Sequence, residues 1–403
     1  MKRLGFILLL AMVTVLADAQ LSGSGFYRVK NYGTDNYFRV CDNTGSINYA
    51  ATTADMAAIQ LWNGLDVSLS EPGSVLYFEN KGGSYWDITS QGTGVYKIIG
   101  RYVEIKSTGT KDNLTFYQVS ATESGVTLYL SDVGSWGGDF NTLGTTGKGA
   151  TRRWLVEPID ASTDSYFGVS PSISAGGKYY APFYADFAFS FASSGMKAYY
   201  VSKVDGDIAV LSEVTADVIP ASTPLIIECS SADKSDNRLN LLTGKYNAVS
   251  GNVLKGVYFC NEFRENSKDA ITAFDASSMR VWGVNAEGKL TLNSETSALH
   301  VNWWGDDDHR YLNANQSYLP VASGTASEMT LMTESEYAEY KESIAQQKQE
   351  DVNGDGKVDT QDVLNVYDVM KSSSDADEKY DVNGDGKVDT QDVLTIYEVI
   401  KGL

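Results

Sequence analysis

The chain is organised around Asp351-Val-Asn-Gly-Asp-Gly-Lys-Val-Asp-Thr-Gln-Asp362-Val-Leu364, a stretch that recurs unchanged from Asp381 to Leu394. Each copy places oxygen-bearing side chains at positions 1, 3, 5, 9 and 12, a glycine at position 6 and a lysine carbonyl at position 7. A calcium loop needs hard oxygen ligands at this spacing and a sharp turn at its sixth residue. The alternative, an acidic tail that merely stays solvated, does not explain a complete pattern written twice.

The predicted cofactor is therefore calcium, with one Ca²⁺ ion in each loop. The ligands of the first loop are Asp351, Asn353, Asp355, Asp359, Asp362 and the carbonyl of Lys357. Those of the second are Asp381, Asn383, Asp385, Asp389, Asp392 and the carbonyl of Lys387. A segment this short buries little surface, and its crowded carboxylates repel one another without a cation. Calcium binding is expected to supply the free energy that folds residues 351–403.

Each loop leads into a stretch with helical periodicity. The apolar residues expected on one face are Val363, Leu364, Tyr367 and Met370, matched in the second copy by Val393, Leu394, Tyr397 and Ile400. A loop followed by a helix, repeated, with aspartate at position 12 where an EF-hand has glutamate, resembles a type I dockerin. The resemblance implies a small, EF-hand-like, calcium-binding helical domain over residues 351–403. Its implied partner is a cohesin-like protein or a cell-surface scaffold.

The duplication also extends to two polar residues that precede each expected helix face. Thr360 and Gln361 recur as Thr390 and Gln391. If the dockerin resemblance holds, these four are the candidate partner contacts, and the two copies can dock in two orientations related by a half-turn.

The start of the chain has the features of an export signal. Met1-Lys-Arg precedes an apolar run from Leu4 to Leu16, and small residues lie at Ala17 and Ala19 before Gln20. The run is too short for a transmembrane anchor, so residues 1–19 are predicted to be a signal peptide of a secreted or cell-surface protein. A net charge of −20 argues against nucleic acid as a partner.

The part before the loops is predicted to be mostly β, because short alternating runs rich in Tyr, Thr and Val are separated by glycine turns. Residues 20–160 show a weak three-fold repetition in which each unit closes on aromatics: Trp62, then Phe116 and Tyr117, then Trp154. With Gln60-Leu-Trp62, this resembles a ricin-type β-trefoil, and Trp62 and Trp154 are expected in its core. A sugar site would pair a ring with polar groups, and the candidates are Asp35, Asn36, Tyr37, Trp136, Asp139 and Asn141.

Three further segments separate this part from the loops. Residues 161–178 are expected to form a linker, rich in serine and glycine. Residues 179–332 are similar to accessory β-sandwich modules of secreted Bacteroidetes proteins (Bacteroides and Prevotella types). The similarity lies only in the order of short sequence segments. Thr333-Glu-Ser-Glu336 is a capping box, which predicts a helical spacer over residues 333–350.

Catalytic signatures are scarce. The run Trp303-Trp-Gly-Asp-Asp-Asp-His309 is read as an acidic surface loop rather than a metal or sugar site, and nothing flanking Cys260 and His300 supports a nucleophile pair. A disulfide between Cys229 and Cys260 is left open. The sequence favours a secreted, non-catalytic protein that binds carbohydrate or another surface ligand. The alternative is a polysaccharide-degrading glycoside hydrolase that carries a dockerin. Such an enzyme needs only two carboxyl groups at a set separation, and these leave no sequence motif.

Overall fold

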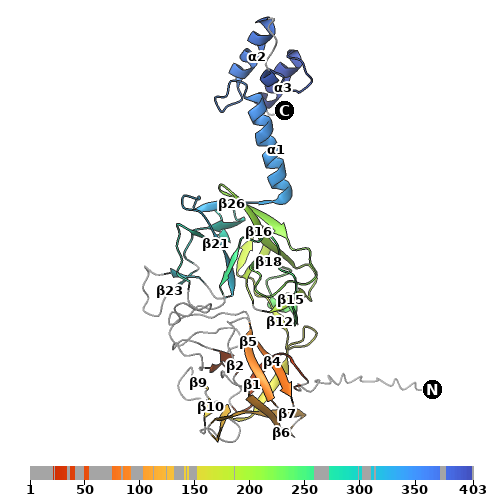
Figure 1. Cartoon of the computed structure of the whole chain (residues 1–403), viewed down its shortest axis with the longest axis vertical. Helices are drawn as coiled ribbons and strands as arrows, with labels where there is room; N and C mark the ends of the chain where they lie inside the picture. Colours follow the sequence, from red (N-terminus) through yellow and green to blue (C-terminus); the bar gives the residue numbers. More distant parts are fainter. Residues whose placement is uncertain are drawn as a thin grey trace, which may run out of the picture. The chain divides into compact units, whose positions relative to one another are not determined.

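Antiparallel strands build the first unit of the computed structural model, Met1–Leu331, and helices build most of the second, Met332–Leu403 (Figure 1). The expected class, mostly β with a small helical C-terminal part, is confirmed at this level. The structure describes residues 21, 23–33, 37–40, 50–53, 75–82, 85–91, 103–111, 113–123, 125–130, 140–141, 143–144, 152–185, 187–257, 272–297, 299–301, 310–312, 315–372 and 378–401.

The N-terminal strands form one curled sheet that closes on itself. Following the pairs, β1 joins β4, β5, β6 and β7 in turn, and β11 then pairs with both β7 and β1, so six strands form a ring. Trp154 on β11 has no exposed surface, which confirms its expected place in the core. Gln60, Trp62, Trp136 and the signal-peptide region lie outside the described residues.

The strands of this sheet are β1 (Gly25–Asn31), β2 (Tyr37–Val40), β3 (Ala50–Thr53), β4 (Val75–Gly82), β5 (Tyr85–Gln91), β6 (Val103–Lys111), β7 (Leu114–Glu123), β8 (Val126–Leu130), β9 (Phe140–Asn141), β10 (Leu143–Gly144) and β11 (Trp154–Pro158).

The middle of the chain forms a ten-stranded sheet and a three-stranded sheet. Strand β18 of the large sheet is buried on both faces. Leu225, Ile227 and Cys229 face one apolar cluster, and Ile226 faces another. A strand buried on both faces reads as a continuous apolar run. The strands of the ten-stranded sheet are β13 (Ile173–Ala175), β14 (Lys178–Phe183), β16 (Lys197–Asp205), β17 (Ile208–Glu213), β18 (Leu225–Cys229), β20 (Lys255–Val257), β21 (Met279–Val284), β22 (Leu290–Asn293), β25 (Gln316–Pro320) and β26 (Glu328–Thr333).

The smaller elements complete this part. The three-stranded sheet contains β12 (Phe167–Gly168), β15 (Ala188–Phe191) and β19 (Arg238–Leu242), and a two-stranded pair contains β23 (His300–Val301) and β24 (Arg310–Tyr311). A short 3₁₀ helix, η2 (Lys234–Asp236), precedes β19.

The N-terminal ring and the middle sheets share an apolar cluster, which differs from the expectation of two domains joined by a linker. Val75 on β4 is buried among Phe167, Phe187 and Phe189, and the ring of Phe26 on β1 lies 6.0 Å from that of Phe187. The expected linker, residues 161–178, contains β12 and β13. Its serines and glycines suggested flexibility, but Phe167 anchors it in the core, where it has only 3% of its surface exposed.

Replacing Phe187 by alanine tests this shared core. Phe187 packs edge-on against Phe26 at 6.0 Å and Phe167 at 5.2 Å, so truncation should destabilise the β part by about 3–5 kcal/mol. Calorimetry should show a single transition for the whole β part, shifted to lower temperature. The exposed Tyr246→Ala variant should change stability by no more than about 0.5 kcal/mol. Two β transitions, of which only one moves, would contradict a common core.

The described cysteine of the middle part is a free thiol. Cys229 is buried on β18, and burial raises the pKa of its thiol to about 12. Cys229 packs in the phenylalanine-rich cluster, and Cys260, the other half of the disulfide that the sequence left open, lies outside the described residues.

The C-terminal unit contains α1 (Glu334–Glu350), α2 (Thr360–Ser372), the 3₁₀ helix η3 (Glu378–Tyr380) and α3 (Thr390–Lys401). The capping box that predicted α1 is present: Thr333 Oγ1 accepts from the N–H of Glu336, and the Glu336 carboxylate accepts from the N–H of Thr333. The helices predicted to follow the loops, α2 and α3, are present and begin slightly earlier, at position 10 of each loop. They lie side by side (Figure 1). Among the described helices, none has the length and apolar character to cross a bilayer.

Candidate calcium-binding and docking site

The first loop is folded around the carboxylate of Asp351. It accepts hydrogen bonds from the backbone N–H groups of Gly354 (2.8 Å), Asp355 (3.1 Å) and Gly356 (2.8 Å). The side-chain oxygen of Asn353 accepts from the N–H of Asp355 at 2.7 Å. Gly356 has φ of 85°, a left-handed conformation that favours glycine. Position 6 therefore needs its glycine for the turn that directs the loop's oxygens inward.

The second loop repeats this arrangement. Asp381 accepts from the N–H groups of Asp385 (3.0 Å) and Gly386 (2.7 Å), and Asn383 accepts from the N–H of Asp385 at 2.9 Å. Gly386 again has φ of 85°. Identical sequences thus give the same local fold twice within one unit.

Position 12 of each loop is a fully buried carboxylate. Asp362 accepts from the N–H groups of Asn353 (3.1 Å) and Asp359 (2.8 Å), and Asp392 makes the equivalent two bonds at the same lengths. In the described part of the chain, neither aspartate forms an ion pair with a lysine or arginine. A buried charge without a counterion is costly, so a cation beside each of these carboxylates fits the structure.

The donor set also fits calcium. Each loop offers carboxylate, amide and backbone carbonyl oxygens, the hard ligands that Ca²⁺ prefers, and no soft sulfur or imidazole group. Among the residues that the structure describes, no three His, Cys, Asp or Glu side chains are gathered at metal-binding spacing. That count leaves out two of the six predicted ligands in each loop, the asparagine amide and the lysine carbonyl. The carboxylates of a loop also repel one another until a cation neutralises them.

The end of α1 is joined to both loops, which was not expected of a plain spacer. Asp351 is the C-terminal cap of α1, and its N–H donates to the carbonyl of Gln347 at 3.0 Å. Gln349 Nε2 donates to the carbonyl of Val382, in the second loop, at 2.9 Å. Glu350 is buried, and this burial raises the pKa of its carboxyl group. The last turn of α1 therefore belongs to the loop domain.

Apolar residues of α2 and α3 divide between two directions, where the sequence analysis expected one face. Val366 and Ile396 have no exposed surface and form the core with Val352, Val382 and Val393, and neither was predicted. The leucines and tyrosines of the expected face point outward instead. Their exposed fractions are 52% for Leu364, 38% for Tyr367, 49% for Leu394 and 45% for Tyr397. One signal in the sequence could have separated the two sets. A β-branched residue lies three positions after Val363 and after Val393, and these residues are Val366 and Ile396.

Both helices thus present the same exposed set, which we call the duplicated face. Its members are Thr360, Gln361, Leu364 and Tyr367 on α2 and Thr390, Gln391, Leu394 and Tyr397 on α3. Large apolar side chains exposed at equivalent positions are typical of an interaction surface.

The predicted sugar residues are only partly within the described residues. Tyr37 has 9% of its surface exposed, its hydroxyl donates to Glu157 Oε2 at 3.2 Å, and Lys30 lies over its ring. Asn141 lies on β9, opposite Ala50. Asp35, Asn36, Trp136 and Asp139 lie outside the described residues. The sugar site therefore stays a prediction.

Comparison with known proteins identifies the C-terminal part. Residues 349–400 match the model of the dockerin type I domain, so this segment is a type I dockerin domain. No curated protein matches the chain. Among solved structures, the chain is similar to a mosquitocidal holotoxin, with 9% identity, a TM-score of 0.19 and coverage of 74% of this chain and 34% of that one. It is also similar to the hemolytic lectin CEL-III, with 9% identity, a TM-score of 0.19 and coverage of 75% and 65%. The chain spans about a third of the first protein and just under two thirds of the second, and likenesses this weak carry no argument.

Proposed function

We propose that this protein attaches its β part to a cohesin-like protein through a calcium-dependent dockerin domain. The observation that carries the proposal is the duplicated face. Leu364 and Tyr367 are exposed at the same helical positions as Leu394 and Tyr397, beyond loops whose oxygen ligands suit Ca²⁺. A dockerin domain at residues 349–400 supports a cohesin as the partner of this face.

Calcium supports docking by holding the two helices in place. Asp362 and Asp392 are the position-12 ligands and also lie in the first turns of α2 and α3. A cation bound at each loop neutralises these buried carboxylates and fixes the first turn of each helix. The duplicated face begins in the same turns, at Thr360 and Thr390, so its geometry depends on the filled loops.

The β part is proposed to bind carbohydrate outside the cell. Its closed ring of six strands and the buried Trp154 support a β-trefoil-like domain. The alternative, a glycoside hydrolase that carries a dockerin, would show activity in a screen of the full chain on polysaccharides.

The docking proposal is tested by surface plasmon resonance of the full chain on a panel of immobilised type I cohesin modules. We expect binding in millimolar Ca²⁺, loss of binding in EDTA, and recovery when Ca²⁺ is restored. Excess Mg²⁺ in place of Ca²⁺ is the control for general divalent effects, since Mg²⁺ demands a smaller octahedral site. Equal binding in EDTA, or no binding to any module in Ca²⁺, would reject the proposal.

A further inference from the structure

One end of the six-stranded ring gathers cationic and aromatic side chains. Tyr32 follows β1, Arg153 precedes β11, and Lys111 ends β6. The N–H of Tyr32 donates to the carbonyl of Arg153 at 2.8 Å, next to the paired residues Asn31 and Trp154. Main-chain pairing therefore brings Tyr32 and Arg153 together, and the side chain of Lys111 reaches Tyr32 from β6.

The side chains here form a ring pair bordered by two cations. The rings of Tyr32 and Phe116 lie 4.5 Å apart between centroids and are tilted by 60°. Lys111 Nζ donates to Tyr32 Oη at 3.3 Å. The guanidinium carbon of Arg153 lies 5.9 Å from the centroid of Phe116. Lys111 and Arg153 are exposed and Tyr32 is half-buried, so a ligand can reach both charges and part of the tyrosine.

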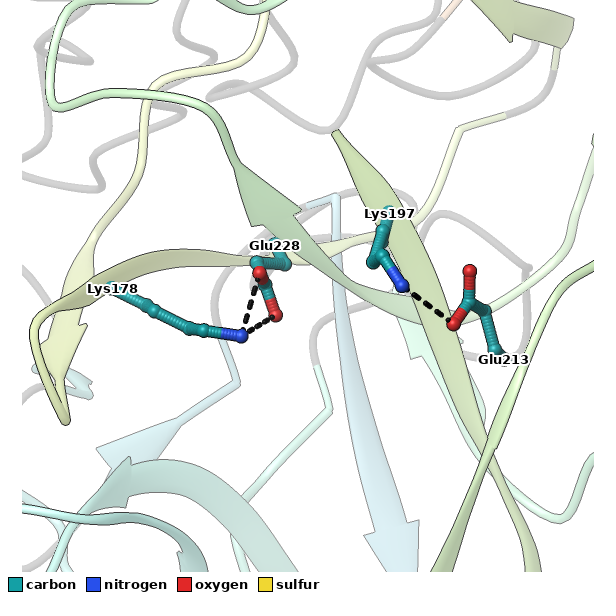
Figure 2. Close-up of polar contacts among 4 residues, drawn as sticks. All are labelled: Lys178, Lys197, Glu213 and Glu228. Carbon is teal, nitrogen blue, oxygen red and sulfur yellow. Dashed lines mark hydrogen bonds and ion pairs between the residues drawn. The ribbon is translucent and has the colours of Figure 1, made fainter. Parts of the chain in front are cut away.

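Two exposed lysines of the middle part are paired with glutamates. Lys178 lies 2.8 Å from Glu228, which raises the lysine pKa through their hydrogen bond, and Lys197 lies 2.9 Å from Glu213 (Figure 2). Arg153 differs: among the described residues, no carboxylate forms an ion pair with it. A guanidinium over a ring keeps its N–H donors for a carboxylate or sulfate.

We propose that this end of the ring binds acidic polysaccharide. Arg153 and Lys111 bind the carboxylate or sulfate groups of the sugar, and the accessible part of Tyr32 packs against its apolar face. The inference rests on the proposed carbohydrate binding and names its ligand class. It involves none of the sugar-binding residues expected from the sequence.

The test is isothermal titration of the full chain with three polymers: polygalacturonate, dextran sulfate and neutral dextran. The first two distinguish carboxylate from sulfate, and the third lacks charge. We expect one or both anionic polymers to bind and dextran not to bind. Affinity should fall as salt is raised, because exposed charges are screened. The variant Lys111→Glu/Arg153→Glu should bind about 10- to 100-fold more weakly, since charge-assisted hydrogen bonds are lost.

A matched control is Lys255→Glu/Lys289→Glu, which makes the same change in net charge at two exposed lysines of the middle part. This control should bind within about twofold of the wild type, as surface changes away from the site have little effect.

Thermal melting checks that both double variants are folded, and Arg153→Gln replaces Lys111→Glu/Arg153→Glu if that variant does not fold. Equal loss in both double variants overturns the site. Binding of neutral dextran without preference for the anionic polymers overturns this inference but leaves carbohydrate binding in place. Binding of none of the three overturns this inference, and a glycan array then decides carbohydrate binding separately.

Discussion

Replacing Asp351 and Asp381 by alanine together is expected to abolish calcium binding, with affinity lowered by more than about 100-fold at each loop. Even partners one shell away from a metal are worth about 10- to 100-fold in affinity, and these two are predicted direct ligands at position 1. Asp351 also organises its loop, because its carboxylate accepts the N–H groups of Gly354, Asp355 and Gly356. The variant loses a ligand and the loop's own hydrogen bonds at once.

The consequence should extend to the helices. Without calcium the remaining carboxylates repel, and the small core around Val366 and Ile396 is too little to fold alone. Far-UV circular dichroism should show loss of α2 and α3, while the β transition in calorimetry stays unchanged. Asp368→Ala/Glu398→Ala removes the same charge from exposed, equivalent positions outside the loops and should leave calcium binding intact. If the position-1 variant still bound two ions with wild-type heat, the assignment of the loops would be wrong.

Changing Leu364 and Leu394 to aspartate is expected to weaken cohesin binding by more than about 100-fold, but only when both are changed. The two side chains are 52% and 49% exposed, so the domain should still fold and bind calcium. An apolar anchor at the centre of an interface is worth about 2 kcal/mol or more, and a buried unpaired carboxylate adds a further penalty.

Each single variant should retain binding within about two- to threefold, because the other copy can still dock after a half-turn. Surface plasmon resonance on a cohesin module that binds the wild type measures all three variants, with calcium titration as the check on folding. If Leu364→Asp alone abolished binding, or Leu394→Asp alone did, the partner would use one orientation. If the double variant bound normally, the duplicated face would not be the docking surface.

The sequence predicted the C-terminal part well because its signals are local. Hydrogen bonds between residues two to five apart form each loop, and the capping box fixes the start of α1. Sequence reasoning reached these features without knowledge of the rest of the chain. It placed Leu364 and Tyr367 on one face with Val363 and Met370, because hydropathy does not tell which of two adjacent helical stripes meets the neighbouring helix.

The β part was harder to predict because its organisation depends on contacts distant in sequence. Phe167 lies in a stretch whose serines and glycines indicated a linker, and only its contacts with Phe183 and Phe187 draw it into the core. Val75 and Phe26 join the same core from the N-terminal ring. Strand composition indicates that a segment is β, but not which sheets will share a hydrophobic core.

The central claim, that calcium folds the dockerin domain, is tested most directly by titrating the calcium-free full chain with Ca²⁺. Heat and far-UV circular dichroism are recorded on the same samples. We expect two ions bound per chain and a gain of helical signal that follows the heat. At a concentration 1,000-fold above the dissociation constant, each site would add about 4 kcal/mol of stability to the domain. Absence of heat, or binding with no gain of helix in a chain already helical without calcium, would contradict the account.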